Sequence, residues 1–136
     1  MTTSEIEAIV ESAIYMDDLE AAEAFYRGVL GLEVIGKEIG RHVFFRVGSG
    51  VLLAFDPEAT LKGDVPPHGS RGPGHFALGV RAEGLDEWRR RLEAHGVAVE
   101  QEVTWPRGGR SLYVRDPAGD SVELVTPGLW GLPSGW

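Results

Sequence analysis

The stretch GHFALG, residues 74–79, decides the fold because it matches in kind a stretch near the start of the chain, VESAIY at residues 10–15. Each is a short strand-like run followed by an acidic-flanked amphipathic helix, a glycine and a second strand-like run. Glu11 of the first stretch corresponds to His75 of the second, and both side chains are of types that bind divalent metals. The pattern indicates an internal duplication, which explains how residues far apart in sequence can converge on one point.

Composition limits the class of protein. The 136 residues, 43% hydrophobic and 25% charged, are typical of one globular domain with a proper core. A formal net charge of −8 argues against a nucleic-acid surface and against a polybasic membrane anchor, so we expect neither partner. The chain has no cysteine, which excludes disulfides and thiolate metal sites. No signal-peptide pattern and no membrane-spanning apolar run are present, so we expect a cytoplasmic location.

The first half of the chain reads as a β-α-β-β-β unit. Alternation predicts a strand over residues 6–15, and Asp17 or Asp18 is expected to cap a helix that runs to about Leu30. Three strands are predicted next, over residues 32–35, 42–47 and 51–55.

The second half repeats this order after a loop rich in glycine and proline. A helix is predicted over residues 85–95, and strands over residues 75–80, 97–102, 110–115 and 121–125. We predict a single domain, 1–136, made of a module over about 5–56, a linker over about 57–73, a module over about 74–127 and a tail over 128–136. The tail carries Trp130 and Trp136, which we expect to pack on the body or on a partner subunit.

Four segments in this order and spacing resemble the vicinal-oxygen-chelate superfamily, also called the glyoxalase/bleomycin resistance protein/dioxygenase family. They are residues 15–26, 29–32, 74–78 and 115–124, and the resemblance covers nearly the whole chain. It implies an α+β fold of two tandem βαβββ modules whose curved sheets form a cupped, open barrel. It also implies a homodimer, in which modules of two subunits can complete each other's cup.

The resemblance implies one divalent metal ion in the cup, with Glu11, His75 and Glu123 as its ligands. Glyoxalase I-like members place a fourth ligand where this chain has Leu53, which cannot bind a metal. Three ligands leave coordination positions open, and the donor set is compatible with Mn, Fe, Ni, Zn or Mg. A bound substrate would then chelate the metal through two neighbouring oxygens.

Further candidates surround this set. Tyr113 lies ten residues before Glu123, where extradiol-type members carry an active-site tyrosine, and we predict that both residues are catalytic. Trp105, Arg107 and Arg110 are predicted to bind substrate, the indole by stacking and the guanidinium groups by clamping a carboxylate or phosphate. The alternatives are a tyrosine that packs on the sheet and a solvated hairpin with a packed tryptophan.

Each metal-ligand candidate also has a structural alternative. Taken singly, Glu11 reads as a rim carboxylate, His75 as a hydrogen-bonded core residue, and Glu123 as the partner of Arg115. Burial of two carboxylates without a cation is unfavourable, which favours the metal site over these alternatives. We interpret His42 as a structural histidine, and His68 as a solvated loop residue rather than part of a lid.

Two functions follow from these observations. The first is a metal-dependent glyoxalase/dioxygenase-like enzyme, a lyase, isomerase or dioxygenase, whose cation chelates vicinal oxygens of a small-molecule substrate. The alternative is a bleomycin-resistance-like protein that sequesters an aromatic or drug-like ligand without catalysis. Trp105, Trp130 and Phe45 would suit such a ligand.

Overall fold

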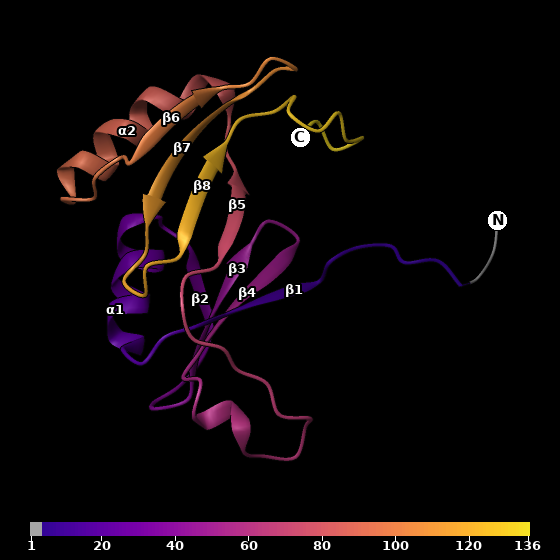
Figure 1. Cartoon of the computed structure of the whole chain (residues 1–136), viewed down its shortest axis with the longest axis vertical. Helices are drawn as coiled ribbons and strands as arrows, with labels where there is room; N and C mark the ends of the chain where they lie inside the picture. Colours follow the sequence, from indigo (N-terminus) through magenta and orange to yellow (C-terminus); the bar gives the residue numbers. More distant parts are fainter. Residues whose placement is uncertain (1–3) are drawn as a thin grey trace. The chain divides into compact units, whose positions relative to one another are not determined.

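The computed structural model describes residues 4–136, and the chain divides into two compact units, Met1–Arg71 (unit 1) and Gly72–Trp136 (unit 2). The elements of unit 1 are β1 (Glu11–Tyr15), α1 (Leu19–Glu23), a π-helix (Ala24–Val29), β2 (Glu33–Glu38), β3 (His42–Val47), β4 (Gly50–Phe55) and a 3-10 turn (Ala59–Leu61). Those of unit 2 are β5 (His75–Gly79), a 3-10 turn (Ala82–Gly84), α2 (Leu85–Ala94), β6 (Gln101–Thr104), β7 (Arg110–Arg115) and β8 (Ser121–Val125) (Figure 1).

Both units have the same topology, which confirms the predicted tandem βαβββ fold. Within residues 4–136, unit 1 forms a four-stranded sheet in the order β1-β4-β3-β2, and unit 2 forms one in the order β5-β8-β7-β6. The first and last strands of each unit pair in parallel, whereas the remaining neighbours are antiparallel. A parallel pair requires a crossover, and the helical segment after the first strand supplies it.

One face of each sheet forms a core. In unit 1 the helical residues Ala22, Phe25 and Tyr26 are buried together with alternate strand residues such as Phe45, whose ring lies 5.5 Å from that of Tyr26. The buried apolar residues of unit 2 are Leu85, Leu92, Leu112, Val114, Val122 and Leu124. The opposite face of each sheet is therefore the one that can carry polar side chains.

Strand register confirms the duplication at the level of single positions. Leu53 of β4 lies opposite Ala13 of β1, and Glu123 of β8 lies opposite Ala77 of β5. Across the antiparallel neighbours, Phe44 lies opposite Leu53, and Tyr113 lies opposite Glu123. Leu53 and Glu123 therefore hold equivalent positions in the two sheets. The sheet face that carries Leu53 in unit 1 carries the polar Glu123 in unit 2.

The first strand is shorter than the alternation predicted. It begins at Glu11 rather than at Ile6, whose side chain is 97% exposed. The reason is the partner strand: β4 begins at Gly50, and the ladder starts with Glu11 opposite Val51. Val10 still accepts the N–H of Val51 at 3.1 Å, but β4 does not extend beside the residues before it, so they are not part of the ladder.

The predicted helix of the first module is not uniform. Asp18 caps it as expected, because its Oδ1 accepts the backbone N–H of Ala21 at 3.0 Å. After Glu23, however, the hydrogen-bond pattern widens to that of a π-helix over Ala24–Val29.

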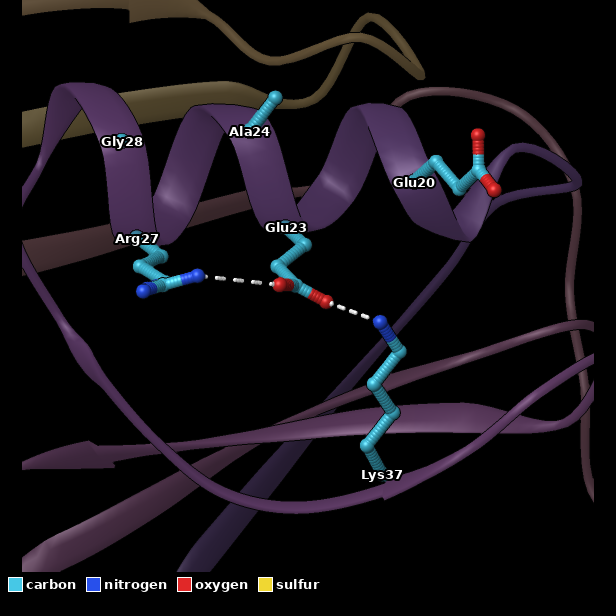
Figure 2. Close-up of a pocket in the computed structure, with 6 residues that line it drawn as sticks. All are labelled: Glu20, Glu23, Ala24, Arg27, Gly28 and Lys37. Carbon is cyan, nitrogen blue, oxygen red and sulfur yellow. Dashed lines mark hydrogen bonds and ion pairs between the residues drawn. The ribbon is translucent and has the colours of Figure 1, made fainter.

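A pocket lies beside this helical segment and reaches Lys37 of β2. It is lined by Glu20, Glu23, Ala24, Arg27, Gly28 and Lys37. Glu23 lies between two cations, with Lys37 Nζ at 2.8 Å and Arg27 Nη1 at 3.4 Å (Figure 2). The Lys37 pair joins β2 to α1. None of our predicted site residues lines this pocket.

The ion pairs of Glu23 predict a loss of stability in acid. The hydrogen bond from Lys37 lowers the pKa of Glu23 below its ordinary value of 4.5, against a smaller opposing effect of burial. Because the folded pKa is the lower one, this stabilisation is complete above the unfolded value and is lost as the pH falls through the folded value. For Glu23→Gln we expect a deficit in unfolding free energy of below about 1 kcal/mol at neutral pH, which shrinks at an acidic pH below the lowered pKa of Glu23. Urea titrations at both pH values measure it, and a deficit that persists unchanged in acid would contradict the assignment.

No helix within residues 4–136 is long and apolar enough to cross a lipid bilayer.

Candidate metal centre

Two of the predicted ligands come together on the polar face of unit 2. His75 is the first residue of β5, and Glu123 is the central residue of β8. Because Glu123 pairs with Ala77, His75 lies diagonally across the parallel ladder from it. The distance from His75 Nε2 to Glu123 Oε1 is 3.3 Å, and the side chain of Glu123 is only 7% exposed. The structure thus brings a nearly buried carboxylate next to an imidazole.

The hydrogen bonds of His75 define which ring nitrogen is available. Its Nδ1 lies 3.0 Å from the backbone carbonyl oxygen of Ser121, which can only accept, so Nδ1 carries the proton. In the neutral imidazole, Nε2 then presents a lone pair toward a carboxylate oxygen. Two electron-pair donors at this distance repel each other unless a cation, either a proton on Nε2 or a metal ion, joins them. An imidazole nitrogen and a carboxylate oxygen with a backbone-held Nδ1–H fit a divalent cation.

Backbone contacts hold β5 against β8 beside this pair. Asp120 Oδ1 accepts the N–H of Gly74 at 2.6 Å, and the N–H of Ser121 donates to the carbonyl of Gly74 at 2.8 Å. Asp116 in turn shapes the preceding turn, because its Oδ1 accepts the N–H groups of Ala118 and Asp120. These contacts flank His75 on both strands and set its position relative to Glu123.

Ser111 is a site residue that sequence reasoning missed. It is fully buried on β7, two residues before Tyr113 and on the same face, and its hydroxyl donates to Glu123 Oε2 at 2.5 Å. The indole N–H of Trp105 donates to the same hydroxyl at 2.8 Å. The signal in the sequence was the period of two: a polar residue two positions from Tyr113 belongs to the face that carries Glu123.

Tyr113 lies on β7 directly opposite Glu123. Burial raises the pKa of its phenol above the ordinary value, and the negative charge of Glu123 and a hydrogen bond to it act in the same direction. Its ring also stacks on that of His75, with centroids 6.2 Å apart. The phenol therefore stays protonated at neutral pH and can act as a hydrogen-bond donor.

The predicted arginines differ in their surroundings. Arg110 forms an ion pair with Glu102, a residue that also pairs with Arg89 at 2.6 Å. Arg107 is exposed in the loop between β6 and β7. Arg115 pairs with Glu100 at 2.8 Å, so the alternative in which it neutralises Glu123 is wrong.

Glu11, the third predicted ligand, is an exposed residue at the start of β1 in unit 1. Within residues 4–136 no three His, Asp or Glu side chains gather closely enough to hold a metal ion. The two predicted ligands that the structure brings together are therefore His75 and Glu123, and metal binding by them and by Glu11 stays a prediction.

The equivalent face of unit 1 carries aromatic rings instead. The imidazole of His42 stacks on Phe44 with centroids 3.9 Å apart, and burial, with a smaller effect of Arg41, lowers its pKa. His68 is not merely solvated: its Nδ1 lies 2.6 Å from the hydroxyl of Tyr15, and its ring lies edge-on to Phe55. The histidine anchors the proline-rich loop to the sheet, a contact that no local pattern in the sequence predicts.

A family model matches most of the chain. The model of the Glyoxalase/Bleomycin resistance protein/Dioxygenase superfamily matches residues 8–124. The chain belongs to this superfamily. The superfamily is the one whose four segments were recognised in the sequence, and its tandem βαβββ fold is the one observed.

Solved structures of the superfamily show the same architecture. A lactoylglutathione lyase from Agrobacterium tumefaciens is 47% identical with a TM-score of 0.87, over 93% of this chain and 98% of that one. A glyoxalase/bleomycin resistance protein/dioxygenase from Nocardioides, at 22% identity and a TM-score of 0.73, covers 98% of this chain and 91% of its own length. A fosfomycin resistance protein from Listeria monocytogenes, at 23% identity, has a TM-score of 0.71 over 92% of this chain and 97% of that one. The last two likenesses concern the fold alone.

Proposed function

We propose that the chain is a divalent-metal-dependent lyase or isomerase that acts on a small molecule with two neighbouring oxygens. The observation that carries this proposal is the contact between His75 Nε2 and Glu123 Oε1 at 3.3 Å, with Nδ1 of the same ring held by a backbone carbonyl. This arrangement orients two electron-pair donors toward one point, as a metal centre requires.

A candidate substrate class follows from the similarity to the lactoylglutathione lyase. Lactoylglutathione is a 2-hydroxyacyl thioester, so its hydroxyl and carbonyl oxygens sit on adjacent carbons. Such a pair of oxygens can chelate one cation. We therefore propose 2-hydroxyacyl thioesters, or compounds with an equivalent pair of oxygens, as substrates.

In this proposal the residues of unit 2 have separate roles. A bound divalent cation would supply Lewis acidity toward the oxygens of the substrate. His75 and Glu123 would hold the cation through Nε2 and Oε1, the two atoms that face each other. Tyr113 keeps its proton on the phenol oxygen, and on substrate binding the hydrogen bond that it now makes to Glu123 would pass to a substrate oxygen on which charge develops. Arg107, which is exposed, is the guanidinium proposed to bind an acidic group of the substrate.

Leu53 limits how far the similarity to the lyase extends. It occupies the place in unit 1 that Glu123 occupies in unit 2, and its side chain offers no ligand. The proposed set is therefore Glu11, His75 and Glu123, with open positions for substrate. A homodimer is also part of the proposal, as the resemblance to the superfamily implied.

One observation favours a second function, the binding of an aromatic ligand without catalysis. The rings of Tyr15, Phe44 and Phe55 lie together on the sheet of unit 1, with Phe44 and Phe55 centroids 5.4 Å apart. Phe45, which the sequence suggested for this role, is instead buried in the core. Phe55 is buried, so a planar ligand would stack on the half-buried rings of Tyr15 and Phe44.

One experiment separates the two functions. Chelator-treated protein is titrated with Mn²⁺, Ni²⁺ and Zn²⁺ by calorimetry, and each form is assayed with lactoylglutathione through its thioester absorbance. We expect the chelator-treated protein to bind a divalent ion, because a cation relieves the repulsion between His75 Nε2 and Glu123 Oε1. We expect turnover in a metal-bound form. The binding function predicts instead that the metal-free protein takes up bleomycin and that Phe44→Ala removes this uptake. Protein that binds none of the three ions would refute the proposed enzyme.

A further inference from the structure

We propose that Trp105 and Ser111 are positioning residues, which form a hydrogen-bond relay that orients the Glu123 carboxylate toward His75. The inference rests on the proposed metal centre for its role but concerns residues outside the ligand set. It also changes the role of Trp105, which the sequence suggested as a stacking surface for substrate.

The direction of the relay follows from the chemistry of its three groups. An indole nitrogen is a donor only, so the contact of 2.8 Å from Trp105 Nε1 requires Ser111 Oγ to accept. The serine hydroxyl has one proton, and its contact of 2.5 Å with Glu123 Oε2 requires Ser111 to donate there. Every hydrogen of the relay is thereby assigned, and it points from the indole to the carboxylate.

The relay holds Oε2 of the carboxylate, and the phenol of Tyr113 also hydrogen-bonds to this carboxylate. Glu123 Oε2 is engaged by Ser111, while Oε1 faces His75 Nε2. Ser111 is fully buried and Glu123 nearly so, which means that water does not compete for these bonds. The carboxylate therefore cannot turn without breaking a buried hydrogen bond.

A tight loop sets the position of the indole. The N–H of Trp105 donates to the carbonyl of Gly109 at 3.0 Å, and the N–H of Gly108 donates to the carbonyl of Trp105 at 3.1 Å. Thr126, directly after β8, anchors the far side by accepting the N–H of Arg110 at 2.7 Å. The loop between β6 and β7 thus connects to the same strand that carries Glu123.

Metal affinity is the first readout. Replacement of a residue that orients a metal ligand commonly lowers the metal affinity tenfold to a hundredfold. We therefore expect Ser111→Ala and Trp105→Phe each to weaken Ni²⁺ binding by about that factor. Trp105→Phe removes the N–H together with the pyrrole half of the indole, so its effect is compared with that of Ser111→Ala, which removes a hydroxyl alone, and with that of the same change at another tryptophan. Trp130→Phe is the matched control because Trp130 is exposed, and it should bind Ni²⁺ as the wild type does. Variants that unfold at lower temperature but bind Ni²⁺ unchanged would show a merely structural role and overturn the proposal.

A second readout needs no metal. In the metal-free protein, the indole N–H resonance of Trp105 is identified by its loss in Trp105→Phe. Glu123→Gln should shift this resonance through Ser111 and leave the other three indole resonances in place. If the chemical shift of the Trp105 indole N–H is the same in Glu123→Gln as in the wild type, the relay is refuted. A wild type that binds no Ni²⁺ but shows the shift would refute the metal enzyme and leave the relay standing.

Discussion

We expect Glu123→Gln to weaken metal binding at the proposed centre by a factor on the order of a hundred or more. This loss exceeds the one expected when a residue that only orients a metal ligand is replaced. The reason is that the amide carries no charge and is a poor ligand beside His75. The same change should leave the metal-free protein as stable as the wild type or more stable by about 1 kcal/mol. The new amide N–H₂ can donate to His75 Nε2 across the present distance of 3.3 Å, which replaces two facing electron pairs by a hydrogen bond. Calorimetric titration with Ni²⁺ and urea unfolding in chelator measure the two effects.

The matched control for this variant is Glu100→Gln. It removes the same charge from the same unit, but Glu100 is exposed and pairs with Arg115. Its metal affinity should equal that of the wild type. If Glu123→Gln and Glu100→Gln bind Ni²⁺ equally well, Glu123 is not a ligand.

Gly109→Ala should destabilise the protein by roughly 3 kcal/mol or more, because a left-handed backbone and a steric clash act together. Gly109 has a φ of +84°, and a Cβ there would lie 2.9 Å from the carbonyl oxygen of Thr126 and 3.1 Å from that of Pro127. Neither atom can move without displacing the backbone that follows β8. Urea unfolding should show the loss, and the displaced loop should also weaken Ni²⁺ binding through Trp105 and Ser111.

Gly119→Ala isolates the conformational part of that effect. Gly119 has a similar φ of +88°, but a Cβ there meets no atom within 4 Å. We expect a loss of only about 1 kcal/mol, the strain of an alanine in the left-handed region. Equal losses for the two variants would mean that the clash at Gly109 is absent.

The predicted equivalence of the modules was visible because it depends on short-range patterns. The alternation of side chains along each strand indicates which face of its strand Glu11, His75 or Glu123 occupies. The offset between the two copies aligns Leu53 with Glu123. Such patterns repeat when a unit is duplicated, so comparison of the two copies identified His75 and Glu123 as the polar residues at positions where the first copy has Glu11 and Leu53.

Contacts between distant segments were the ones the sequence left open. Ser111 looked like any strand serine until β7 was placed beside β8, where it meets Glu123. His68 looked like a loop residue until the loop returned to Tyr15. The strand expected from Ile6 failed for the same reason, because the length of a strand depends on where its partner begins.

By itself, the sequence determined the duplicated order of strands and helices, since this follows from local periodicity, and its resemblance to the superfamily implied the residue types at the proposed centre. Only the tertiary structure decided which atoms of those residues act. The backbone carbonyl of Ser121 sets the free nitrogen of His75, and Ser111 sets the free oxygen of Glu123. Both choices are made by hydrogen-bond partners on neighbouring strands, whose positions depend on register and packing rather than on any local pattern.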